Sequence, residues 1–168
     1  MDKSAILVKQ DGALAIARIV GKGSFKNARF LKNYAETVSG AGTNQVILDL
    51  QECLHMDSTF MGVLAGIACE QKKLGHQRLK IIHANSRNME LLASLGLNRI
   101  LEIDPIINNE AADSSYTPLE TNEEADKDEV ARTMLDAHQK LIDTDKNNAA
   151  KFQDVITFLK NKLHTDGQ

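Results

Sequence analysis

The side chains best suited to chemistry in this sequence are the hydroxyls of Ser58 and Thr59, which follow Asp57 directly after the segment VILDLQECLHM. Asp57 is placed to cap the start of a helix, and Ser58 and Thr59 would be its first residues. Both hydroxyls would then lie at the positive, NH-rich end of that helix, where an anion or phosphate group is favoured. A capped helix without any further role explains the same residues equally simply.

Other motifs for catalysis or cofactor binding are incomplete. The run GKGSFK at 21–26 supplies two glycines of a dinucleotide-binding fingerprint, but Lys26 stands where the third is needed, and no GxxxxGK[ST] loop is present. The histidines form no HExxH motif and no pair four residues apart: they are His55, His76, His83, His138 and His164. We therefore predict no cofactor, no zinc or acid–base site and no enzymatic activity.

Acidic and amide side chains near the C-terminus partly follow a calcium-loop pattern. Positions 1, 3, 5 and 12 of such a loop are matched by Asp143, Asp145, Asn147 and Asp154. However, Asn148 replaces the glycine of position 6, and Asp154 is shorter than the bidentate glutamate that calcium requires. We interpret this segment as a turn between helices and predict no metal.

Composition indicates one ordinary domain with a small appendage. The chain has 168 residues, 42% hydrophobic, and a formal net charge of −3, so it can bury a core and is not disordered throughout. It contains no apolar run long enough to span a membrane and no signal-peptide pattern, so a cytoplasmic location is expected. Cys53 and Cys69 are predicted to be reduced core residues. The absence of tryptophan and of a basic stripe argues against nucleic-acid binding.

Charge divides the chain into two parts. Residues 1–109 carry 13 basic and 10 acidic side chains, whereas residues 110–168 carry 7 and 13. The change falls in a segment with both prolines of the chain and many acidic and small polar residues, which is typical of an extended linker. We predict a main domain at 1–104, an acidic linker at 105–125 and a C-terminal helical extension at 126–168.

Hydrophobic periodicity predicts strands that alternate with helices in the main domain. Asp11-Gly12 between two β-branched-rich runs is a strong hairpin signal. The expected strands are 4–10, 13–20, 46–50, 79–84 and 99–103, and the expected helices are 24–40 capped by Ser24, 58–74 and 87–95. This order indicates an α/β fold in which helices flank a mixed sheet of four to five strands. Its core should include Val46, Ile47, Leu48, Leu64, Ile67, Ile81 and Ile82.

Two amphipathic helices are expected between residues 123 and 164. The first has an apolar stripe of Val130, Met134, Ala137, His138 and Leu141, and the second has one of Phe152, Val155, Ile156, Leu159 and Leu163. Such stripes must be buried against each other and against something else. The main domain, a second copy of the chain in a homodimer, and another protein all remain open as that surface.

The main domain resembles the STAS domain of bacterial anti-sigma factor antagonists. The resemblance covers about residues 4–104 and is carried by the hairpin, the segment VILDLQECLHMDSTFMGVL, the later LLASLGL and the strand RILEI, in that order. Family members carry Asp-Ser-Ser/Thr and then glycine at this strand-to-helix junction. Here Phe60 stands in place of that glycine, while Gly62 is kept.

The resemblance implies a phosphorylation-switched binding module in transcription regulation. Ser58, the first hydroxyl after the aspartate, would be the phosphorylated residue, with Thr59 as the alternative, and Asp57, Ser58, Thr59 and Phe60 would form the partner-binding segment. The implied partners are an anti-sigma factor that is also a serine kinase and a serine phosphatase, so that ATP and the catalytic groups belong to the kinase. STAS-like domains also serve as accessory subunits of membrane transporters or as small-ligand and lipid-handling modules, which is the rival interpretation.

Overall fold

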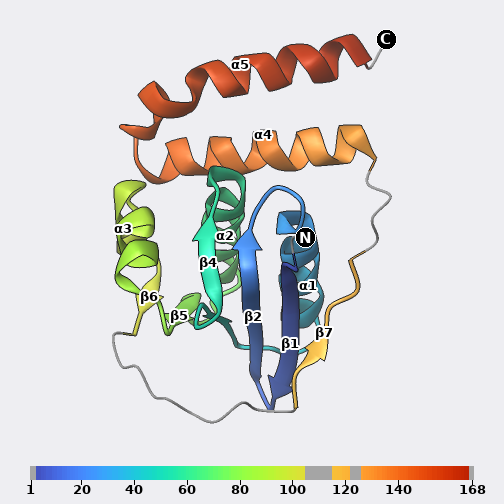
Figure 1. The fold of residues 1–168 in the computed structure, drawn as a ribbon, viewed down its shortest axis with the longest axis vertical. Helices are drawn as coiled ribbons and strands as arrows, with labels where there is room; N and C mark the ends of the chain where they lie inside the picture. The colour runs from blue at the N-terminus through green and yellow to red at the C-terminus, as the bar shows by residue number, and fades with distance from the viewer. Residues whose placement is uncertain (1–2, 105–114, 122–125, 167–168) are drawn as a thin grey trace.

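The computed structural model describes residues 3–104, 115–121 and 126–166. Its strands are β1 (Ala5–Asp11), β2 (Leu14–Gly23), β3 (Gln45–Asp49), β4 (Cys53–Met56), β5 (Lys80–Ile82), β6 (Glu102–Ile103) and β7 (Thr117–Pro118). Its helices are α1 (Ala28–Gly40), α2 (Ser58–Lys73), α3 (Ser86–Ser94), α4 (Lys127–Thr144) and α5 (Asn148–Asp166), with a 3-10 turn at Leu97–Arg99. The expected mixed α/β fold with two C-terminal helices is confirmed (Figure 1).

The chain opens with the expected hairpin. β1 and β2 pair antiparallel, with Asp11 opposite Leu14, so that only Gly12 and Ala13 form the turn. Gly12 has a φ of 61°, which a residue with a side chain rarely adopts and which a two-residue turn requires. The dipeptide Asp11-Gly12 therefore sets the register of the first two strands.

The sheet is mixed and its central strand is buried. The strand order is β6-β5-β3-β2-β1-β7, with β4 pairing beside β2, and only the pairs β1–β2 and β1–β7 are antiparallel. All five residues of β3 are buried, as an apolar strand with covered faces should be. Within the described residues the sheet has seven strands and not the expected four or five, because β4 and β7 were not anticipated.

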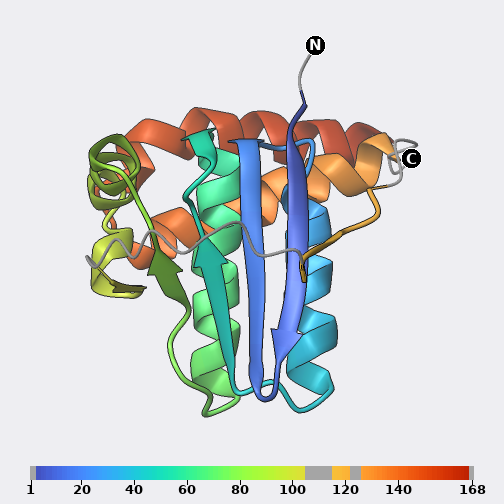
Figure 2. The ribbon, with the colours of Figure 1, turned by 60° about the horizontal axis from the view of Figure 1, so that its bottom comes forward.

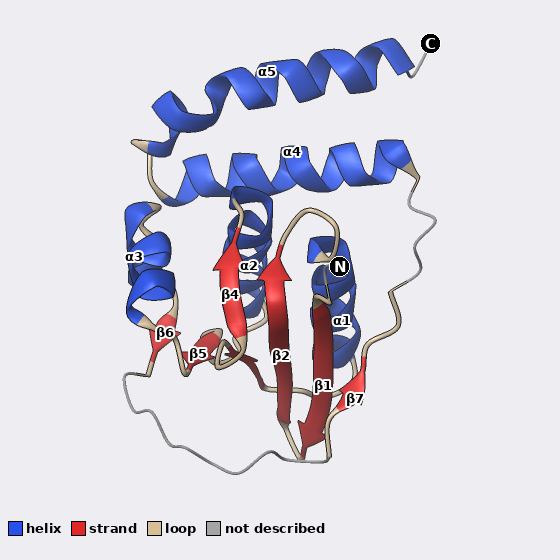
Figure 3. Ribbon diagram, viewed as in Figure 1, coloured by secondary structure: helices blue, strands red, loops and turns tan. Residues whose placement is uncertain are grey.

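Helices cover the sheet on one face and at one end. α1 and α2 lie side by side against one face of the sheet, and α3 lies at the side of β5 and β6 (Figures 2 and 3). α4 crosses the end of these layers at which α2 begins, and α5 packs on the outside of α4 (Figures 1 and 2). The beginning of α2 therefore lies underneath α4.

The core lies between the sheet and α1 and α2. Val46, Leu48, Leu64, Ile67 and Ile81 belong to one buried cluster, as expected. Ile47 is buried outside that cluster, and Ile82 is only half-buried because it faces the other side of the sheet from Ile81.

Several boundaries differ from those expected. Helix α1 begins at Ala28 and not at Ser24, because Asn27 Oδ1 accepts a hydrogen bond from Ser24 N and holds residues 24–27 in a turn. The strand expected at 99–103 is reduced to Glu102–Ile103, because a 3-10 turn after Gly96 occupies its first residue. Residues 105–114 and 122–125 of the expected linker lie outside the described residues, whereas Thr117–Pro118 within it pairs with β1.

The C-terminal helices bury their expected stripes against each other and the main domain. Ala137, His138 and Leu141 of α4 and Ile156 and Leu159 of α5 are buried, and the other five residues of the two stripes are half-buried. In the described part of the chain, no helix has the length and apolar character that crossing a membrane requires.

Candidate functional site

Asp57 fixes the start of α2 with both carboxylate oxygens. Its Oδ1 accepts a hydrogen bond from Phe60 N at 2.8 Å, which caps the helix, and its Oδ2 accepts one from Phe25 N at 2.9 Å. The backbone N–H of Asp57 donates to Gly23 O at 2.9 Å. The helix start is therefore tied to the end of β2 and the turn after it, which holds the next residue, Ser58, in place.

Ser58 is the first residue of α2 and is half-buried. Its Oγ lies 2.9 Å from Nε2 of His138 in α4. His138 Nδ1 lies 2.6 Å from the backbone oxygen of Met134, and because a carbonyl only accepts, Nδ1 carries a proton. A ring whose only proton is on Nδ1 accepts at Nε2, so the hydroxyl of Ser58 is the donor of the hydrogen bond to His138.

The other two residues expected to face a partner are buried. Thr59 is buried, and the ring of Phe60 is 0% exposed. A Cβ added at Gly23 would lie 2.7 Å from Phe60 Cδ1, so this ring occupies the space above the glycine at the end of β2. The side chains of Thr59 and Phe60 thus pack into the domain, which leaves Asp57 and Ser58 as the more accessible side chains of the segment. That Asp57, Ser58, Thr59 and Phe60 bind a partner stays a prediction.

Sequence reasoning gave His138 only a place in an apolar stripe. The residue is 3% exposed, and its ring also contacts that of Phe152 edge to face, with centroids 5.1 Å apart. Ser58 and His138 are 80 residues apart in the sequence, so no local pattern could have paired them.

A second polar cluster lies at the carboxyl ends of β3 and β5. The carboxylate of Asp49 accepts hydrogen bonds from Arg18 Nε and from Gln51 N, and Asp49 Oδ1 lies 2.9 Å from His83 Nδ1. Burial acts to lower the pKa of Arg18, but the hydrogen bond and charge of Asp49 outweigh it, so this pKa lies above its usual value. The cluster holds three neighbouring strands together.

In the part of the chain that the structure describes, the remaining histidines, cysteines and acidic side chains do not gather at one place. His55 lies 3.5 Å from Arg87 and His76 lies 3.3 Å from Gln71. Burial is the main cause that raises the pKa of the Cys53 thiol, which keeps it protonated. Asp145, from the calcium-like segment, pairs with Arg99 at 2.6 Å. Within residues 3–104, 115–121 and 126–166, no three His, Cys, Asp or Glu side chains are placed to share a metal ion.

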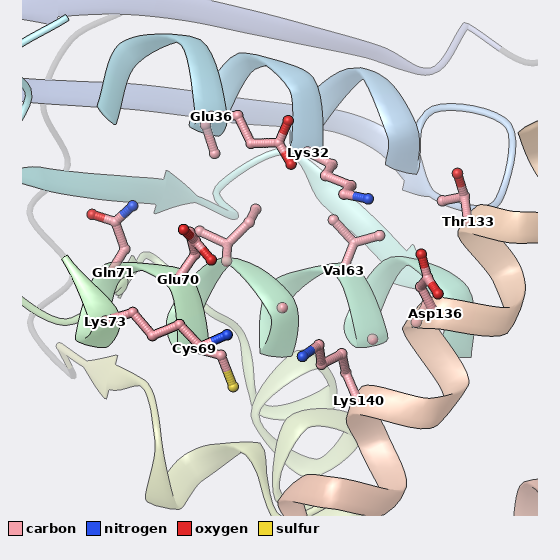
Figure 4. A pocket seen from close by; sticks show the side chains of 15 residues that line it. Lys32, Glu36, Val63, Cys69, Glu70, Gln71, Lys73, Thr133, Asp136 and Lys140 are labelled. Carbon is pink, nitrogen blue, oxygen red and sulfur yellow. The ribbon is translucent and has the colours of Figure 1, made fainter. Parts of the chain in front are cut away.

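A pocket of about 350 Å³ lies where α1, α2 and α4 meet. Gly62, Gly66 and Ile67 of α2 are among its lining residues. Charged side chains of both signs surround it (Figure 4). Lys32 and Glu36 come from α1, and Asp136 and Lys140 come from α4. The pocket is thus a gap in the contact between α4 and the main domain.

Comparison with known proteins supports the fold of the main domain. The family model of the STAS domain matches residues 5–112. An anti-sigma factor antagonist from Mycobacterium paratuberculosis is 17% identical, with a TM-score of 0.54 over 63% of this chain and 89% of that one. The unphosphorylated form of the antagonist SpoIIAA is 15% identical, with a TM-score of 0.53 over 60% and 88% of the two chains.

The phosphorylated form of SpoIIAA, a cell fate determinant of Bacillus, is 14% identical, with a TM-score of 0.50 over 60% of this chain and 91% of that one. At these identities, the likeness to solved structures shows a shared fold. Comparison with curated protein sequences gives no match.

Proposed function

Because this chain belongs to the STAS domain family, we propose that it is a phosphorylation-switched binding module of the anti-sigma factor antagonist type. With Ser58 unphosphorylated, it binds an anti-sigma factor that is also a serine kinase; with phosphate on Ser58, it releases that partner, and a serine phosphatase reverses the change. The observation that carries the proposal is the position of Ser58, as the first residue of α2 directly after the Asp57 cap.

Each residue of the site has a role that its geometry supports. Asp57 holds the helix start through its two hydrogen bonds, so that the Ser58 hydroxyl has a fixed position. The free N–H groups and dipole of α2 favour an added phosphate at this end of the helix. The chain is a substrate and a binding surface, since the kinase supplies the ATP and the groups that move the phosphoryl group.

The phosphate would act on the partner mainly through charge. It adds about −1.5 to −2 charges at Ser58. A partner carboxylate held ~4 Å away would experience about 4 kcal/mol of repulsion per unit charge at an effective dielectric constant of ~20. That energy corresponds to roughly three decades of affinity, so one hydroxyl can switch a complex without unfolding the domain.

Incubation of the chain with its cognate kinase and ATP, followed by peptide mapping, tests the assignment. We expect phosphate on Ser58, and Ser58→Ala should abolish modification while costing about 1 kcal/mol of stability, because only one hydrogen bond is lost. Ser86→Ala is the matched control, since Ser86 is also a first helical residue after a side-chain cap, in α3. Phosphate confined to Thr59, or no phosphate from a kinase that binds the chain, would contradict the proposal.

A further inference from the structure

α4 covers one face of α2, and that face begins with Ser58. Residues four apart share a face of a helix, which places Ser58, Gly62 and Gly66 in one row. A Cβ added at Gly62 would lie 2.6 Å from the Cβ of Ala137 and would also collide with the backbone carbonyl of Ala137. The backbones of α2 and α4 therefore approach closely one turn beyond Ser58. At the N-terminal end of the same row, Ser58 itself contacts α4 through its hydrogen bond to His138.

The same contact engages the hydroxyl that a kinase would have to reach. Phosphoryl transfer requires the acceptor oxygen to be free for in-line attack and its proton to be taken by a group of the kinase. Here the hydroxyl of Ser58 is engaged as the donor of a hydrogen bond to His138, and α4 lies over it. A phosphate on Ser58 would add three oxygens next to Nε2 of His138, which lies only 2.9 Å from Oγ in a ring that is 3% exposed, so the group fits only if α4 moves.

The attachment of the helical pair combines apolar packing with polar ties and a gap. Ala137 and Leu141 of α4 belong to the buried core cluster, and Phe152 of α5 packs against it. Beyond the Gly62 contact, α4 and α5 are held by Arg29 with Glu129 at 2.9 Å and by Asn148 Nδ2 with Leu95 O at 3.0 Å, besides the Asp145–Arg99 pair. The 350 Å³ pocket interrupts the same interface, whereas protein cores contain few voids larger than a water molecule. The apolar packing between the helical pair and the main domain is therefore interrupted, and such an interface is easier to open than a continuous apolar core.

We propose that α4 and α5 form a releasable intramolecular cover over the Ser58 face of α2. The cover is docked while Ser58 carries a free hydroxyl, so the anti-sigma factor must displace it in order to bind. Phosphorylation of Ser58 also releases the cover, but the charge of the phosphate then keeps that partner away from the open face. This inference rests on the proposed function, because it assigns a regulatory element to the same serine. The full chain thus alternates between a state in which α4 occupies the Ser58 face and a state in which that face is open.

Hydrogen–deuterium exchange of the full chain with phosphoserine installed at position 58 during translation tests the release without any kinase. We expect the amides of α4 and α5 to exchange at least tenfold faster than in the unmodified chain, while those of β2 and β3 stay protected. Phosphoserine at position 86 is the matched control, because Ser86 also begins a helix after a cap but is exposed in α3. It should leave α4 protected.

A pair of glycine variants tests whether α4 can be released without a phosphate on Ser58. Gly62→Ala introduces the Cβ that collides with Ala137 and should release α4 by the same tenfold criterion. Gly66→Ala is the control, since its Cβ would meet only Lys140 Cγ at 3.9 Å, an ordinary contact. With the cognate kinase, Gly62→Ala should be phosphorylated at Ser58 at least tenfold faster than Gly66→Ala.

Two outcomes would overturn the cover. One is phosphoserine 58 with unchanged exchange in α4; the other is Gly62→Ala accelerating exchange in the sheet as much as in α4, since the helices would then be an inseparable part of the domain. If the cognate kinase still modifies Ser58 in either case, the proposed function stands without the cover. If phosphoserine 58 releases α4 but no partner kinase modifies Ser58, the proposed function fails instead.

Discussion

At the scale of single residues, the fit between Phe60 and Gly23 joins the helix start to the sheet. The fully buried ring of Phe60 occupies space that a side chain at position 23 would need. Phe60→Ala should therefore lower the free energy of unfolding by about 3–5 kcal/mol, through lost burial and the cavity left behind. Urea unfolding measures this loss. Phe25→Ala, at a position 42% exposed, should change stability far less, and an equal loss in both variants would contradict the proposed packing.

The residues of the candidate site differ in how far the sequence could reveal them. Asp57 as a helix cap follows from local chemistry, and the structure confirms it. The burial of Phe60 could not be derived, because a residue in the first turn of a helix faces the core or solvent depending on how the helix is docked. His138 could be recognised only as part of a buried stripe, since its hydrogen bond to Ser58 joins two elements distant in sequence.

At the scale of elements, the carboxylate of Asp49 ties β3 to β2 and to the residue after β5. Asp49 is 1% exposed, and Arg18 and His83 both contact it. Asp49→Ala should cost about 3–5 kcal/mol, because it leaves a largely buried guanidinium without its partner. Lys80→Ala, which removes a half-exposed pair with Asp104 at 3.6 Å, should cost about 0–1 kcal/mol. Thermal and urea unfolding compare the two, and similar losses would show that the Asp49 cluster is not essential to the sheet.

Elements with a complete local pattern were predictable, whereas β4 and β7 were not. The apolar run at β3 and the capped start of α2 fix those elements nearly to the residue. β4 and β7 have four and two residues, too few for a hydrophobic period, and they exist because β2 and β1 offer edges for pairing. The late start of α1 results from the Ser24–Asn27 turn, in which side-chain hydrogen bonds compete with the helix.

At the scale of the whole molecule, the sequence indicates two C-terminal helices but not the surface that buries them. Their stripes would serve equally for docking on the main domain, on a second copy or on another protein. The deciding features belong to the surface that the stripes meet: the glycine row of α2, where Gly62 allows Ala137 to approach closely, and the backbone carbonyl of Leu95, which accepts a hydrogen bond from Asn148. Complementarity between two surfaces that are distant in the sequence produces no periodic pattern of residues, so it could not be predicted from the sequence.

Phe152 offers a test of where the helical pair docks. Its half-buried ring packs against the core and meets His138, so a carboxylate there would be placed against apolar groups. Phe152→Asp should lower the free energy of unfolding by about 2 kcal/mol and leave the mass measured by light scattering unchanged, because the stripe packs within the same chain. Phe158→Asp, in the same helix at a position 67% exposed, should change stability by no more than about 0.5 kcal/mol. A wild-type dimer that Phe152→Asp converts to a monomer would instead place this stripe at an interface between two copies.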